Sequence, residues 1–154
     1  MLHQVFVYGT LKQGFRNFHV NHGVRVPGEF VTVRPHMLLI VGEFWLPWLL
    51  QAEPETEVGF AVVGQIYTVD DAGLAAMDRL EQIDEAGWYE RRRIAVHARH
   101  GDSGDSGDSG NVLQPWVYCG SREGLAAGGQ RLGPIAEFTL AHQDLLPRER
   151  WSLG

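Results

Sequence analysis

A short apolar run near the N-terminus, VFVYGTL at residues 5–11, constrains the fold more than any other stretch. Its first residues are β-branched or aromatic and a glycine soon follows, so the run predicts a strand that ends in a turn. Glycine at position 9 permits a positive φ and a close approach of the backbone to a ligand. The N–H groups of Gly9, Thr10 and Leu11 would then converge on one anionic or carbonyl oxygen. The alternative is an ordinary strand-to-turn junction without a ligand.

Length and cysteine content predict one domain over residues 1–154 in a reducing compartment. A chain of 154 residues can bury a substantial core without disulfides or metal. Its single cysteine, Cys119, excludes an intrachain disulfide and a CxxC metal site. The N-terminus lacks a signal-peptide pattern, and no stretch reaches the roughly 18–20 apolar residues that span a bilayer. We therefore expect a cytoplasmic protein without a membrane partner.

Charge and histidine spacing exclude two other classes of partner. A net charge of −6 argues against a nucleic-acid surface, so small molecules are the expected partners and a monomer is favoured. His19 and His22 have the spacing of a metal pair on a helix, but no third ligand follows at a suitable distance. The sequence therefore predicts no metal site.

One helix is predicted to begin after residue 69, with Asp70 or Asp71 as its N-cap. Apolar residues at three-residue steps form its buried stripe: Leu74, Met77 and Leu80. Glu81, four positions after Met77, projects onto the edge of that stripe. Desolvation there would raise its pKa toward the range of a general base, in the absence of an opposing cation.

Other interpretations of the helix charges remain open. Glu81 is also compatible with a snorkelling or salt-bridged side chain at a helix end. Asp78 and Glu85 are interpreted as solvated charges, and Glu85 would share the face of Glu81 only if the helix continued.

Runs rich in apolar and β-branched residues predict strands at residues 28–33, 36–41, 58–69, 88–97 and 115–119. The two-residue period of the 88–97 strand places Tyr89 and Arg91 on one side, where both would face one pocket. The tryptophans at 45 and 48 predict core packing rather than a wall of the substrate site.

The last part of the chain is expected to contribute little to the core. A threefold Gly-Asp-Ser repeat closed by glycine, residues 101–110, predicts a flexible hairpin loop between the last two strands. Residues 121–154 are expected to form a peripheral wrap with one helical turn.

Several motifs together resemble a known family. They are VFVYGTLK at 5–12 with Gly14 and Asn17, VGE at 41–43, LPWLL at 46–50, GQIYTVD at 64–70, MDRLE at 77–81 and YER at 89–91. In this order they are similar to the γ-glutamylcyclotransferase-like (AIG2-like) family, above all its γ-glutamylamine cyclotransferase branch. The resemblance covers about residues 4–120.

The resemblance implies an α+β fold: a small mixed β-barrel with one main helix and short flanking helices. It implies a reaction without metal or cofactor, in which the α-amine of a γ-glutamyl group attacks its own γ-carbonyl and releases 5-oxoproline and a free amine. Carried over by position, the catalytic residue is Glu81. The implied substrate-binding residues are Tyr8, Gly9, Thr10, Leu11, Asn17, Tyr89 and Arg91.

Two departures and two alternatives accompany the resemblance. The gap from Glu81 to Tyr89 is a couple of residues longer than in that branch, which leaves Glu85 as a weaker catalytic candidate. The chain after residue 120 does not match, so the leaving amine stays undefined. One alternative is a non-catalytic module of the same fold that binds a small carboxylate or a protein. The other is an amidase with Cys119 as nucleophile, although no histidine is placed by a motif beside it.

Overall fold

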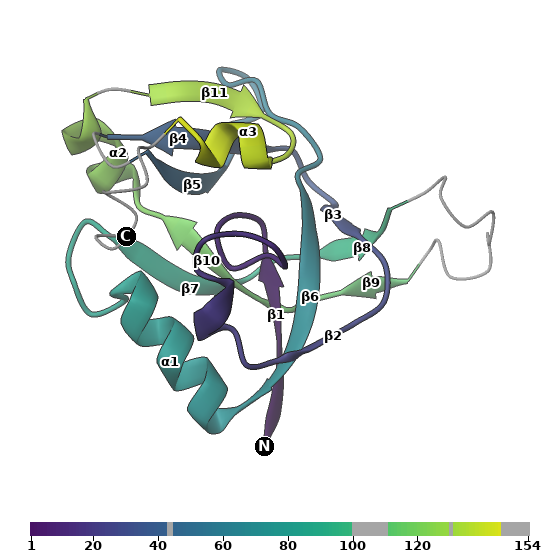
Figure 1. Ribbon diagram of the computed structural model, residues 1–154. Helices are drawn as coiled ribbons and strands as arrows, with labels where there is room; N and C mark the ends of the chain where they lie inside the picture. The colour runs from purple at the N-terminus through teal and green to yellow at the C-terminus, as the bar shows by residue number, and fades with distance from the viewer. Residues whose placement is uncertain (43–44, 100–110, 130, 146–154) are drawn as a thin grey trace.

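The computed structural model describes residues 1–42, 45–99, 111–129 and 131–145. Within these residues two β-sheets and a few short helices form an α+β fold, and the larger sheet curls around the core (Figure 1). This confirms the mixed barrel-like architecture and the single main helix. The expected hairpin loop at 101–110 and the glutamate of the 41–43 motif lie outside the described residues. No described helix has the length and apolar character needed to cross a membrane.

The strands are β1 (Leu2–Val7), β2 (Val24–Arg25), β3 (Phe30–Thr32), β4 (His36–Val41), β5 (Leu46–Gln51), β6 (Val63–Asp70), β7 (Tyr89–Arg93), β8 (Val96–Ala98), β9 (Val112–Leu113), β10 (Trp116–Gly120) and β11 (Arg131–Ile135). The helices are the 3₁₀ turn η1 (Phe18–Val20), α1 (Asp71–Glu81), α2 (Arg122–Gly128) and α3 (Leu140–Gln143).

The larger sheet is built around β1. In the described chain its order is β7-β10-β1-β6-β3-β8-β9, with β2 also paired to β6. β1 runs antiparallel to β6 and parallel to β10, so both of its edges are hydrogen-bonded. The smaller sheet has the order β11-β4-β5. β1 therefore occupies the interior of the larger sheet, and the predicted strand at the start of the 5–11 run is confirmed.

Two clusters of buried side chains form the core. One joins the two sheets through Phe6 of β1, Leu38 of β4 and Phe138, each without exposed surface. The other lies under α1 and contains Met77, which is also fully buried, and Tyr67 of β6. β4 contributes to both clusters, and all six of its residues are buried. The sheets and α1 are thus held together by apolar burial on both sides of β4.

The ends of helix α1 are set by its N-cap and by a left-handed residue after its last turn. Asp70 is the N-cap, and its side chain accepts a hydrogen bond from the Gly73 N–H at 2.7 Å. The helix ends because Gln82 adopts a left-handed conformation with φ of 53°. Glu81 is therefore the last helical residue, and the helix does not continue to Glu85.

Two predicted strands differ from the structure. The expected 58–69 strand begins only at Val63, and Phe60 makes an isolated bridge to His36 instead. The expected 88–97 strand is divided, because β7 pairs with β10 whereas β8 pairs with β3. Pairing of the last strand with the first part of the 88–97 segment is confirmed.

The C-terminal segment contributes more than the expected peripheral wrap. Over its described residues it forms α2, α3 and β11, and β11 adds a third strand beside β4. Phe138 is fully buried, and Gln143 is 4% exposed. Phe138 thus completes the apolar core cluster that joins the two sheets.

Gly64 marks the tightest approach between β6 and β1. A Cβ at this position would lie 2.5 Å from the Val7 carbonyl oxygen and 2.6 Å from the Phe6 ring. We expect Gly64→Ala to lower the free energy of unfolding by about 1–3 kcal/mol through overpacking. Urea unfolding followed by tryptophan fluorescence measures this change. An unfolding free energy equal to that of the parent would contradict the packing argument.

Candidate active site

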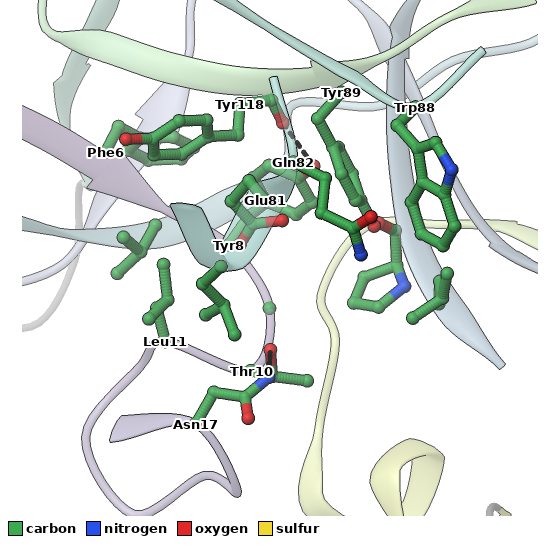
Figure 2. A pocket seen from close by; sticks show the side chains of 15 residues that line it. Phe6, Tyr8, Thr10, Leu11, Asn17, Glu81, Gln82, Trp88, Tyr89 and Tyr118 are labelled. Carbon is green, nitrogen blue, oxygen red and sulfur yellow. Dashed lines mark hydrogen bonds between the residues drawn. The ribbon is translucent and has the colours of Figure 1, made fainter. Parts of the chain in front are cut away.

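A cavity of about 50 Å³ lies where the C-terminal ends of β1 and α1 meet β5, β7 and β10. Its walls include seven of the eight residues carried over by resemblance: Tyr8, Gly9, Thr10, Leu11, Asn17, Glu81 and Tyr89 (Figure 2). Arg91 is not among the lining residues. The structure thus brings the N-terminal loop and the helix-end glutamate to one pocket, although they are about seventy residues apart in the chain.

The turn after β1 is held by hydrogen bonds that leave three backbone donors available. The Asn17 amide donates to Thr10 Oγ1 at 2.8 Å, and the Asn17 N–H donates to the Thr10 carbonyl at 3.0 Å. In the described chain the N–H groups of Gly9, Thr10 and Leu11 donate to no protein acceptor. The turn is therefore rigid and retains donors for a carboxylate or oxyanion.

Gly9 is required for a reason that differs from the expected positive φ. The structure records no left-handed conformation at this residue. A Cβ there would lie 2.7 Å from Cγ of Pro47. Glycine is needed because β5 packs directly against the turn.

Glu81 lines the pocket, and its carboxyl makes no hydrogen bond or ion pair to another described residue. Burial raises the pKa of its carboxyl from 4.5 to about 8, and the positive charge of Arg16 opposes this shift. The residue keeps part of its surface accessible, because the cavity adjoins it. A carboxyl with this pKa can gain and lose a proton near neutral pH, as a general acid/base must.

Two tyrosines beside Glu81 have their hydroxyl protons engaged elsewhere. Tyr8 donates to the backbone carbonyl of Tyr118, and Tyr89 donates to that of Pro47. Burial is the largest cause that raises the pKa of both phenols, and the charge of Glu81 adds to it. Both rings therefore remain neutral and fix the walls of the pocket without donating to Glu81.

Arg16 is the functional candidate that the sequence reasoning missed. Its Nε, Nη1 and Nη2 atoms are shielded from solvent and have no hydrogen-bond partner in the described part of the chain. Burial lowers the pKa of the guanidinium, and the negative charge of Glu81 opposes this shift. Its backbone N–H donates to Gln143 Oε1 at 2.7 Å, so α3 fixes this loop. An arginine in an aperiodic loop carries no sequence signal for such a position.

Arg91 and Asp78 have roles that differ from the expected ones. Arg91 Nη1 donates to Asp78 Oδ2, and Tyr118 Oη donates to Asp78 Oδ1, each at 2.6 Å. Asp78 is thus a structural carboxylate one helical turn before Glu81, not a solvated charge. Through it Arg91 orients Tyr118, which lines the pocket, so the expected contact of Arg91 with substrate is not supported by its position.

The weaker candidates lie away from the pocket. Glu85 is exposed in the turn after α1 and does not line the cavity. Cys119 is buried, and burial raises the pKa of its thiol to about 12, which disfavours a nucleophilic thiolate. No group of three or more His, Cys, Asp or Glu side chains in the described residues could hold a metal ion.

Comparison with known proteins supports the resemblance. The family model described as gamma-glutamyl cyclotransferase, AIG2-like, matches residues 5–139. Gamma-glutamylaminecyclotransferase B of Danio rerio is 37% identical over 103 residues, which are 64% of this chain and 51% of that protein. Gamma-glutamylaminecyclotransferase of Mus musculus is 38% identical over 97 residues, 60% of this chain and 62% of that protein. The matches thus span only about half to three fifths of these relatives.

A solved structure also resembles this chain. The crystal structure of an AIG2-like protein from Mus musculus has a TM-score of 0.67 and 29% identity to this chain, and the match covers 90% of this chain and 88% of that one. The family model includes both the turn after β1 and Glu81. With residues 5–139 matched, the chain belongs to the gamma-glutamyl cyclotransferase, AIG2-like family.

Proposed function

We propose that this chain is a γ-glutamylamine or γ-glutamyl amide cyclotransferase that releases 5-oxoproline and a free amine, with Glu81 as general acid/base. The observation that carries this proposal is the Glu81 carboxyl, which has a pKa of about 8 and lies in one pocket with the N–H groups of the turn after β1. The names of the relatives support the same substrate class.

The reaction needs two proton transfers, one from the attacking nitrogen and one to the leaving nitrogen. The neutral α-amine attacks the γ-carbonyl carbon, so an N–C bond forms and the five-membered ring closes. The attacking nitrogen then loses a proton, and the leaving nitrogen gains one as the γ-amide C–N bond breaks. Glu81 accepts the first proton and delivers it to the leaving nitrogen, so the carboxylate returns to its starting state.

Positioning and electrostatics supply the remaining rate enhancement. The nucleophile and the electrophile belong to one molecule, so a pocket that holds it curled exploits effective molarities of order 10⁵–10⁸ M. The N–H groups of Gly9, Thr10 and Leu11 offer donors for the substrate carboxylate or the developing oxyanion. No step requires a metal ion.

Glu81→Gln tests the assignment of the proton carrier. We expect this variant to fold normally and to lower turnover by roughly 10²- to 10⁴-fold, because the amide cannot exchange a proton. The assay measures 5-oxoproline formed from a γ-glutamyl amine. Glu85→Gln is the matched control and should retain parent turnover. Near-normal turnover of Glu81→Gln would refute the role, and failure of the parent to form 5-oxoproline would favour a binding module.

The pH profile tests the influence of Arg16. The carboxylate form of Glu81 accepts the first proton, so kcat/KM should rise with pH through a midpoint of about 8. The positive charge of Arg16 lowers the pKa of Glu81, so removing it in Arg16→Gln should move this midpoint to higher pH. Arg16→Lys keeps the charge and should shift the midpoint less. A midpoint that stays unchanged in Arg16→Gln would contradict the coupling.

Blocked substrates test the turn after β1. A bound substrate buries the N–H donors of this turn, and a buried donor without an acceptor costs binding energy. A substrate that lacks the accepting group should therefore react poorly. We expect N-acetylation of the α-amine or amidation of the α-carboxylate to abolish 5-oxoproline formation. The first change also removes the nucleophile, so the second is the sharper test. Equal turnover of the α-amidated compound would exclude the proposed contact.

A further inference from the structure

The catalytic pocket has room for only one end of a γ-glutamyl conjugate. A water molecule needs on the order of 10–15 Å³ of such space, so a cavity of about 50 Å³ accommodates a group equal to about three to five waters. This is enough for the part that becomes 5-oxoproline. The leaving amine must then extend beyond the pocket.

A second cavity adjoins the pocket at Leu46 and Trp88. It has a volume of about 350 Å³, and both of these side chains line it as well as the catalytic pocket. In Figure 2 Trp88 stands beyond Tyr89, at the opposite side of the pocket from Phe6. Both shared side chains are partly exposed, so they offer apolar surface between the two cavities.

Among the described residues, the side chains that line this groove are apolar apart from one carboxylate. Val41 of β4, Trp48 of β5 and the Ala127 side of α2 complete it. Trp48 Nε1 donates to the Ser121 carbonyl at 2.8 Å, so its indole N–H is already satisfied. Glu123 is the one ionisable residue among the groove's described lining, and no cation is present there to pair with a carboxylate. The groove therefore suits a methylene chain or ring and disfavours an anionic end.

Helix α2 forms the outer wall of the groove because its small residues let it pack closely against Gly87 and Trp48. A Cβ on Gly124 would lie 2.1 Å from the Gly87 carbonyl oxygen and 2.6 Å from the Trp48 ring. Ala127, about one turn later, is exposed and faces the groove with only a methyl group. A larger side chain at position 127 would occupy the groove without entering the core.

We propose that this groove is the subsite for the leaving amine, and that it selects γ-glutamyl conjugates whose amine carries an extended apolar chain. The assignment rests on the proposed function. The γ-glutamyl end is held in the pocket beside Glu81, and the chain leaves past Leu46 and Trp88 to lie against Trp48 and α2. Selection at this end follows apolar contact area, since the described lining offers few polar groups.

Three substrates test the subsite in the parent protein: γ-glutamyl methylamide, γ-glutamyl n-hexylamide and the γ-glutamyl conjugate of 6-aminohexanoate. We expect kcat/KM for the hexylamide to exceed that for the methylamide by about tenfold or more. The carboxylate-bearing conjugate should have a lower kcat/KM than the hexylamide, because the described lining of the groove holds Glu123 and no cation. Equal kcat/KM values for the three would overturn the subsite while leaving the proposed function intact. Absence of 5-oxoproline from all three would overturn the proposed function itself.

Ala127→Phe locates the subsite on the structure. Filling the groove should lower the hexylamide-to-methylamide ratio of kcat/KM by about tenfold. Ala126→Phe is the matched control, since Ala126 is exposed on the same helix and does not line the groove. A ratio unchanged by Ala127→Phe, or lowered equally by both variants, would refute the location. If Ala127→Phe does not fold, the three-substrate comparison in the parent still decides.

Discussion

The burial of β1 between β6 and β10 determines where the pocket-lining turn after β1 lies. Val5 and Phe6 have no exposed surface, and a slip of one residue would move each of them to the opposite face of the sheet. The point at which β1 ends is therefore fixed, and with it the turn that follows. The Tyr8 hydroxyl bond to the Tyr118 carbonyl ties the first residue of this turn to β10. The pocket is thus a consequence of strand register rather than of a separate loop fold.

Two carboxylates on α1 show how the same scaffold produces opposite electrostatic behaviour. Asp78 accepts from Arg91 and Tyr118, so its charge is paired within the protein. Glu81 follows about one turn later, no side chain in the described residues donates to it, and burial is the largest cause of its raised pKa. A paired carboxylate holds structure, whereas an unpaired one beside a cavity can exchange a proton with a ligand. The two acids differ because β7 and β10 supply Asp78 with donors, whereas Glu81 lies beside the cavity.

The sequence predicted the position of pocket residues better where that position depends on local pattern. The phase of α1 placed Glu81 beside the apolar stripe, and the resemblance selected it over Glu85. Asp78 was misread because its partners come from β7 and β10, far away in the sequence. Arg16 was missed because the burial of its guanidinium depends on tertiary packing. The 88–97 segment was predicted as one strand because its side chains alternate throughout. The alternation does not reveal that its pairing partner changes from β10 to β3.

The two ends of a γ-glutamyl conjugate would be recognised by different physics in different parts of the chain. The turn after β1 offers backbone N–H groups, so side-chain changes there alter the donors little, provided that the register of β1 and the glycine beneath Pro47 remain. The groove depends on side chains of α2, whose one buried residue is Leu125. Substitutions at its exposed groove positions, Glu123 and Ala127, remove little from the core, so they can reshape the groove at small cost in stability. Under the proposed function, catalytic chemistry and choice of leaving amine would diverge independently, because β1 and α1 hold the groups proposed for the first and α2 lines the groove proposed for the second.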